Sequence, residues 1–476
     1  MICAYTKARD PFAASKHLRK MEENNLVPQQ ESYIEVIKAL LPISRSSAWN
    51  LFAHMRLVAH TTPNLQAYNL MLSACSTGQH PSPERAVDLY EEMQEHKIQP
   101  DIFTFTALIR TCSRTRRAGE ESYYLRGIEF LRQMLDAGLT PDRSTLHAIM
   151  DGARRVGDLS RARWIFYKVA VSPWKESVDD VTAALLFQTY ATFKVQPAPL
   201  LRERLREGRK LATDQALDKD IAVPLDNLPS PLPRTAEEVV QQVRALMASS
   251  LASKGLDTSL LFRDGNLQPS PVFESIKLTP LLLNSFLLAH QRGSHIFSKC
   301  LLLYEKLFKL ASVPKNGYSY ELIMQSCEKP NDRQLGLETA RKCFAEWKTW
   351  AISRPVKEIQ ASEIWSSMIR NLARNDLSKE GVEEVTRFRQ AFPPTQLVEF
   401  ARNQKAITRL APETQVQIAD PVYPETSASW KPPLLTFKAI APLHKCLADL
   451  GDLDGLKKVK RVLLAYRIAD ERRKHL

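Results

Sequence analysis

The feature that most constrains this chain is a proline followed by a short polar residue, which recurs just before each fresh amphipathic segment. The steps Pro63-Asn64, Pro100-Asp101 and Pro141-Asp142 each close one unit and open the next. The segments AVDLYEEMQEHKIQPD (86–101) and GIEFLRQMLDAGLTPD (127–142) share the same order of apolar helix, methionine, turn and Pro-Asp. Repeats of this kind bury their core between neighbouring units. We therefore expect a tandem array whose function lies on a repeated surface.

The units run over 30–64, 65–101 and 102–142, and a further one starts at Arg143. Their period is about 35 residues, which suits a pair of short helices. The insertions GQHPSPE and TRRAGEESYY fall between the paired helices, where a stack tolerates extra loop. Few glycines and many Leu, Ala, Glu, Lys and Arg predict helices throughout. The fold class is therefore all-α, an α-solenoid of helix-turn-helix units.

The repeat pattern lapses over 196–275, which holds eight prolines around helical stretches at 199–218 and 235–255. We interpret 1–195 as an N-terminal repeat array and 196–275 as a divergent or inserted region. Degenerate helical repeats return over 276–394. A linker and a basic pair of capping helices follow over 395–476. The first unit begins in mid-helix, so we expect any targeting sequence to lie upstream of Met1.

Composition narrows the kind of partner. Hydrophobic residues make up 44% of the chain and charged residues 25%, which is typical of a folded protein. The net charge of +13 favours an acidic partner such as nucleic acid, although basic helix ends are often only solvated faces. No apolar run is long enough to span a membrane. The seven scattered cysteines are interpreted as reduced, packed thiols.

Units such as LQAYNLMLSACSTG…ERAVDLYEEMQEHKIQPD resemble the pentatricopeptide repeat, with Tyr-Asn entering the first helix and a closing Pro-Asp. The resemblance is strong over 1–170, weaker over 276–392 and absent over 196–275. It implies a right-handed superhelix whose first helices line a groove for single-stranded RNA, one base per repeat. The tetratricopeptide repeat, with its Trp-Leu-Gly-Tyr pattern, is a poorer match.

In this family the fifth and last residues of a unit select the base. The resemblance therefore assigns RNA contacts to Asn69 with Asp101, which favours uracil, and to Thr106 with Asp142, which favours guanine. Other units depart from the code. Their pairs are Ile34 with Asn64, His147 with Ser177, and Asn284 with Asn316 as a partial match.

Helical spacing gives independent support, because residues at i, i+4 and i+7 share a face. This spacing groups polar side chains on each first helix, and nearby arginines suit phosphate. The alternative is that every solenoid needs one polar face. The predicted polar faces hold Asn69, Ser73 and Ser76; Thr106, Arg110 and Ser113; and His147, Asp151 and Arg154.

The chain shows no pattern that predicts catalysis. It has neither the His-x-Glu nor the Pro-Cys-x-x-Cys of a zinc deaminase, and no GxxxxGK[ST] phosphate loop. The histidines show no paired ligand spacing. The tryptophans 164, 347, 350 and 365 fit packing between repeats better than base stacking. We predict no enzyme activity, metal or cofactor.

The sequence therefore favours a single-stranded RNA-binding adaptor in mitochondrial RNA metabolism, acting on mRNA or rRNA in the matrix; the resemblance alone supplies this location. A repeat scaffold on the small mitochondrial ribosomal subunit, contacting rRNA and proteins, is the main alternative. A scaffold that binds only proteins is a third.

Overall fold

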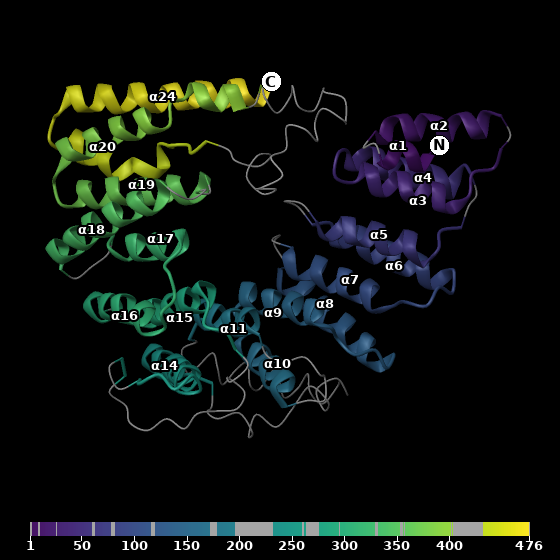
Figure 1. Cartoon of the computed structure of the whole chain (residues 1–476), viewed down its shortest axis with the longest axis horizontal. Helices are drawn as coiled ribbons and strands as arrows, with labels where there is room; N and C mark the ends of the chain where they lie inside the picture. The colour runs from purple at the N-terminus through teal and green to yellow at the C-terminus, as the bar shows by residue number, and fades with distance from the viewer. Residues whose placement is uncertain are drawn as a thin grey trace. The chain divides into compact units, whose positions relative to one another are not determined.

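The chain is described by a computed structural model, in which helices account for the regular structure of the described residues (Figure 1). It divides into two compact units: residues 1–258 with 264–277, and 259–263 with 278–476. The described residues are 2–195 and 232–475, without 8–9, 25, 60–61, 78–80, 116–119, 172–178, 259–260, 263–275, 295, 329–331, 353–355, 357, 401 and 403–431.

The first unit is a stack of helix pairs, as the Pro-Asp spacing predicts. The first helices α5, α7, α9 and α11 contact one another in chain order (Figure 1). The pairs are α1 (Ile2–Lys7) with α2 (Pro11–Glu23), α3 (Gln30–Leu40) with α4 (Arg45–Leu57), α5 (Leu65–Ser76) with α6 (Pro83–Glu95), α7 (Ile102–Arg114) with α8 (Glu120–Asp136), and α9 (Arg143–Val156) with α10 (Leu159–Val171); α11 (Asp180–Thr192) and α14 (Ala236–Ala252) follow.

The residue after each proline step caps the next helix. The side chains of Asn64, Asp101 and Asp142 accept from the backbone N–H three residues on, at 3.0, 2.8 and 2.7 Å. Asp179 does the same for α11 at 2.8 Å. Proline ends the preceding segment and the cap satisfies an N–H that the helix cannot pair, so each step fixes where a first helix starts.

The core of this unit lies between paired and successive helices. The methionine near the end of each second helix, Met55, Met93 and Met134, is fully buried. Tyr33 and Tyr68 are buried at equivalent places on α3 and α5, and their hydroxyls donate to Glu22 and Glu92. The recurrence of the same residue types at the same depth follows from the period of the sequence.

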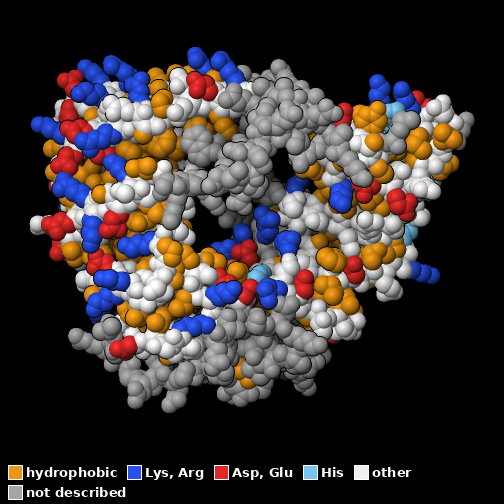
Figure 2. Space-filling model, viewed as in Figure 1, with side chains coloured by type: hydrophobic (Ala, Val, Ile, Leu, Met, Phe, Trp, Pro, Cys, Tyr) orange, Lys and Arg blue, Asp and Glu red, His pale blue; other side chains and the backbone are white. Residues whose placement is uncertain are grey.

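The second unit also consists of helix pairs, as predicted after residue 276. Trp347 and Trp365 are buried in it, which confirms their packing role. In Figure 2, Lys and Arg side chains gather along its last helix, α24. The pairs are α15 (Pro280–Gly293) with α16 (Phe297–Leu310), α17 (Gly317–Ser326) with α18 (Arg333–Ile352), α19 (Glu358–Arg374) with α20 (Ser378–Ala391), and α23 (Ala441–Asp449) with α24 (Leu453–His475), preceded by η3 (Lys438–Ile440).

Two further expectations concern single segments. The helix predicted over 235–255 is α14, whereas the stretch 199–218 lies outside the described residues. Among the described helices, none combines the length and apolar character that a membrane span requires.

Candidate nucleic-acid interface

A cleft of about 720 Å³ runs across the first helices α5, α7 and α9 of the first unit. It brings together five side chains that the sequence nominated for RNA contact, from three successive helices. Its lining residues are Asn64, Leu65, Gln66, Asn69, Ser73, Asp101, Phe103, Thr106, Ala107, Arg110, Asp142 and Ser144.

Asn69 and Asp101 form one hydrogen-bonded group in this cleft. The Asn69 Nδ2 amide donates to both carboxylate oxygens of Asp101, at 3.0 and 3.1 Å. The Thr104 hydroxyl lies 2.7 Å from Asn69 Oδ1 and 2.9 Å from Asp101 Oδ1. The fifth residue of one repeat is thus hydrogen-bonded to the residue that caps the first helix of the next repeat.

Thr106 and Asp142 repeat the arrangement one helix further on, through Thr145. The hydroxyl oxygens of Thr106 and Thr145 are 2.6 Å apart, and Thr145 donates to Asp142 Oδ1 at 2.6 Å. Thr106 is only 7% exposed. Its hydroxyl oxygen also lies 2.7 Å from the Ile102 carbonyl oxygen. Asp142 is therefore the more accessible polar group of this pair.

The third such contact joins His147 to Asp179, a pair that the sequence pattern does not predict. His147 Nε2 is 3.2 Å from Asp179 Oδ1 and 3.2 Å from Thr182 Oγ1. Burial raises the pKa of Asp179, but bonds from Thr182 and the nearby His147 outweigh it and hold that pKa below its usual value. The predicted partner, Ser177, lies outside the described residues. The cap of α11 is Asp179, because the helix starts at Asp180.

The described part of the second unit also contains this arrangement. Asn284 Nδ2 donates to Asn316 Oδ1 at 3.1 Å, and Asn316 accepts from Ser319 at 3.0 Å. Asn284 is 1% exposed, however. The expectation that its amide is offered to RNA is wrong for this structure, because the residue packs inside its unit; Asn316 remains half-buried.

The two predicted arginines differ in their bonding. Arg110 donates to Ser144 at the cleft wall. Arg154 donates to Asp151 through Nε at 3.0 Å, and Arg155 shares that carboxylate at 2.8 Å. Burial raises the pKa of Asp151, yet the bonds from both arginines lower it overall. Much of the Arg154 charge is therefore balanced by Asp151, whereas Arg110 keeps its charge facing the cleft.

Compared with the residues predicted from the sequence, the cleft also contains Phe103 and lacks Ser76 and Ser113. Phe103 is 72% exposed and lines the cleft beside the Asp101 cap. Helical periodicity in the sequence predicts only that Phe103 lies on a helix surface, and it does not distinguish this ring from other exposed side chains. The expectation that Ser76 and Ser113 share the polar face is wrong, because both are buried where successive first helices pack.

The cleft offers hydrogen-bond acceptors, three side-chain amides, one guanidinium and one aromatic ring. No group of three side chains able to hold a metal ion occurs among the described residues. This chemistry suits recognition of an unpaired base by its edge, its face and its phosphate.

Comparison with known proteins relates these units to a repeat family. Residues 63–114 match the PPR repeat family, and residues 1–26 match the PPR repeat. The 63–114 match contains α5, α6 and α7, and therefore includes Asn69, Asp101, Phe103 and Arg110.

The chain is also similar to curated fungal proteins. The mitochondrial 15S rRNA processing factor CCM1 of Zygosaccharomyces rouxii is 26% identical over 364 residues, which cover 67% of this chain and 43% of that protein. The protein of the same description from Eremothecium gossypii is 23% identical over 299 residues, covering 53% of this chain and 34% of that protein. The chain spans less than half the length of these relatives.

Among solved structures, the pentatricopeptide repeat protein PPR10 from maize is 16% identical, with a TM-score of 0.44. The aligned region covers 98% of this chain and 59% of that chain. PPR10 in complex with an 18-nt psaJ RNA element gives a TM-score of 0.41 at the same identity, covering 98% of this chain and 60% of that one.

Proposed function

Because the first unit carries pentatricopeptide repeats, we propose that this protein binds single-stranded RNA along the cleft of α5, α7 and α9. It acts there as a non-catalytic adaptor in mitochondrial rRNA processing. The observation that carries the proposal is the convergence of Asn69, Asp101, Phe103 and Arg110 on one cleft. The names of the fungal relatives support the rRNA target and the mitochondrial location.

The chemistry of the cleft suggests how a base is held. The carboxylates of Asp101 and Asp142 can only accept hydrogen bonds, so they favour bases that present an imino N–H, as uracil and guanine do. Phe103 supplies a face for stacking, and Arg110 a charge for the adjacent phosphate. Asp101 and Asp142 are held in place as helix caps, and Arg110 is held by its bond to the Ser144 hydroxyl.

The adaptor role follows from how the titratable groups of the cleft are used. Asp101 and Asp142 cap helices, and each accepts from a threonine hydroxyl. Carboxylates bonded in this way stabilise the repeat, and their remaining lone pairs can accept hydrogen bonds from an RNA base. The proposed role is therefore to mark or shield a site on an RNA in the matrix, while other factors carry out the cleavage.

A second function is a scaffold that contacts rRNA on the small mitochondrial ribosomal subunit. It is favoured by the internal bonding of the Asn69 amide and the burial of Thr106, which leave few groups for base reading. Contacts to phosphates and to RNA shape then contribute more of the affinity.

Crosslinking in mitochondria followed by sequencing of the bound RNA tests both functions. The adaptor predicts a discrete footprint on one precursor RNA, which is weakened by Asn69→Ala and Phe103→Ala together. The scaffold predicts contacts spread over mature rRNA and co-sedimentation with ribosomal subunits at moderate salt. Absence of any crosslinked RNA, with the protein folded and imported, would overturn both and favour a scaffold for proteins alone.

A further inference from the structure

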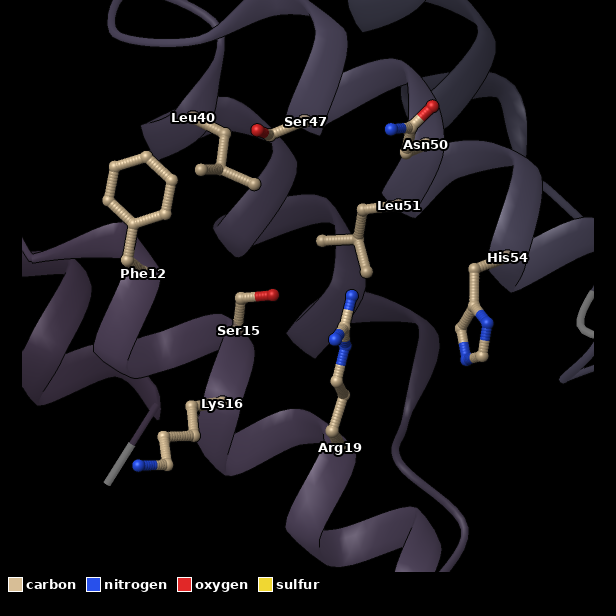
Figure 3. Close-up of a pocket in the computed structure, with 9 residues that line it drawn as sticks. All are labelled: Phe12, Ser15, Lys16, Arg19, Leu40, Ser47, Asn50, Leu51 and His54. Atoms are coloured by element: carbon tan, nitrogen blue, oxygen red, sulfur yellow. The ribbon is translucent and has the colours of Figure 1, made fainter.

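A second hollow of the first unit lies between α2 and α4, the second helices of the first two pairs (Figure 3). Its volume is about 430 Å³. The RNA cleft is lined by the first helices α5, α7 and α9, so the two surfaces use different helices. The lining residues of this hollow, here called the α2/α4 groove, are Phe12, Ser15, Lys16, Arg19, Leu40, Ser47, Asn50, Leu51 and His54.

The α2/α4 groove combines an apolar floor with a basic margin. Leu40 and Leu51 are almost fully buried, whereas Phe12 is 53% exposed. In Figure 3 the Arg19 side chain reaches from α2 toward Leu51 of α4, and Lys16 extends outward at the margin. An apolar side chain could bury itself on this floor while an attached acidic group meets the cations.

The positive charge of this groove is not balanced by its own walls. None of its lining residues is a carboxylate. The nearby Glu22 accepts from His54 Nε2, at one end of the groove, at 2.9 Å and from the Tyr33 hydroxyl, and it forms no ion pair with Lys16 or Arg19. Lys16 and Arg19 are exposed and form no ion pair with any described residue.

Two other grooves between second helices differ from the α2/α4 groove, because carboxylates line both of them. Between α6 and α8 the lining contains three carboxylates around one arginine. Between α16 and α18 the lining holds four lysines and three glutamates, and two of the lysines are ion-paired, Lys342 with Glu305 at 2.9 Å and Lys315 with Glu346 at 3.4 Å. A solvated helix surface of this protein therefore normally mixes both signs, and the α2/α4 groove departs from that pattern.

We propose that the α2/α4 groove docks an acidic amphipathic helix from a protein partner. An apolar residue of that helix packs on Leu40 and Leu51 beside the Phe12 ring, and its carboxylates pair with Lys16 and Arg19. A groove between two helices suits a third helix, as in other helix-in-groove interfaces. The apolar floor distinguishes this occupant from an RNA backbone, which would leave the floor unused. The surface would let the protein recruit a partner while RNA occupies α5, α7 and α9.

The test uses the full chain and a fluorescent 16-residue helical peptide with leucines on one face and glutamates on the other. Its twin has lysine in place of every glutamate. The acidic peptide is expected to bind and its twin is not. The double variant Lys16→Glu with Arg19→Glu should weaken acidic-peptide binding by about tenfold or more, since both contacting charges reverse. Phe12→Ala should weaken it by a smaller factor.

Lys20→Glu is the matched control, because Lys20 is an exposed cation on the same helix outside the groove. It should leave peptide binding unchanged. Equal losses in Lys20→Glu and the double variant would mean general attraction and would overturn the proposal. So would stronger binding of the lysine twin, or displacement of the peptide by a single-stranded oligouridine. Loss of RNA binding through cleft variants leaves the peptide result unaffected, so the two proposals fail separately.

Discussion

The Asn69 side-chain amide donates to both carboxylate oxygens of Asp101, a residue 32 positions later in the chain. The same spacing joins His147 to Asp179 and Asn284 to Asn316. Each bond links a first helix to the cap of the next one. Asp101 is therefore both a helix cap and a proposed RNA contact, so we expect changes at this position to affect stability as well as RNA binding.

The cap role of Asp101 gives the first prediction. Asp101→Ala removes the bond to the Thr104 N–H and leaves the Asn69 amide without its carboxylate. We expect the free energy of unfolding of the first unit to fall by about 1–2 kcal/mol, the usual cost of a lost N-cap. Asp101→Asn keeps an acceptor and should lose less. Urea denaturation followed by circular dichroism measures both.

Asp88→Ala is the control for this prediction, because Asp88 is an exposed aspartate of the same unit. Its effect should stay within about 0.5 kcal/mol, as for ordinary surface changes. Equal denaturation midpoints for the Asp88 and Asp101 alanine variants would show that the cap contributes nothing measurable.

Phe103 gives the second prediction. Its ring is largely exposed in the cleft, so Phe103→Ala should leave stability nearly unchanged. RNA binding should weaken by about 1–3 kcal/mol, the usual contribution of one base stacked on an aromatic ring. Fluorescence anisotropy with a labelled single-stranded RNA measures the loss. Leu125→Ala is the control, since Leu125 is an exposed apolar residue of α8 that does not line the RNA cleft; similar losses in both variants would exclude stacking by Phe103.

The third prediction concerns Arg110. If Arg110 neutralises one phosphate, Arg110→Gln should reduce the slope of log binding constant against log salt by about 1, with little change in sequence preference. The comparison variant is Lys97→Gln, in the exposed turn after α6. RNA-binding titrations of both variants at several salt concentrations measure this slope. An unchanged slope in the Arg110 variant would mean that its guanidinium serves only to bond Ser144 and hold α7 against α9.

The helix starts could be predicted from sequence because capping is local. Asp101 and Asp142 each follow a proline and precede an apolar helix, and the structure places them as caps. The pairing of Asn69 with Asp101 can also be predicted from the sequence, because it follows the repeat period. What sequence could not show is the intervening Thr104 or Thr145, since that contact depends on how closely two first helices approach.

The packing of neighbouring helices, which the sequence does not show, also explains the other differences between the predicted and the observed site. Thr106 and Ser113 lie at polar positions of α7, yet α9 covers them because small residues allow close packing there. Gly152 of α9 approaches so closely that an added Cβ would lie 2.7 Å from Ser113 Oγ. The sequence does not identify Asp179 as a cap, because no proline precedes it. Exposure of Phe103 depends on which neighbours pack beside it, which one helical period does not reveal.

The fourth prediction is a pH dependence carried by Glu321 in the second unit. Burial, and to a lesser degree the charge of Glu363, raises the pKa of Glu321 to about 7 from 4.5. Between these values the folded chain holds a proton that the unfolded chain has lost. The contribution to stability is thus complete below the unfolded pKa and is lost as pH rises through the folded one.

Glu321→Gln stays uncharged, so it should melt a few degrees above the wild type at about pH 8 and match it near pH 4. The melting temperature measured across this range tests the prediction. Glu338→Gln, at an exposed carboxyl of α18, serves as the control. A gap between wild type and Glu321→Gln that is the same at every pH would contradict a titrating Glu321.

The fifth prediction uses the cysteines as reporters of packing. Burial raises the pKa of Cys75 to about 11 and those of Cys112 and Cys343 to about 12. Because the thiolate is the reactive form, these buried thiols should resist iodoacetamide in the folded protein, whereas the exposed Cys3 reacts readily. Mass spectrometry of peptides after timed labelling measures each site. Denaturant should make all of them react alike, which controls for local sequence effects. Fast labelling of Cys112 without denaturant would show that the contact between α7 and α8 opens readily. The helix α7, which also lines the RNA cleft, would then not be held rigidly.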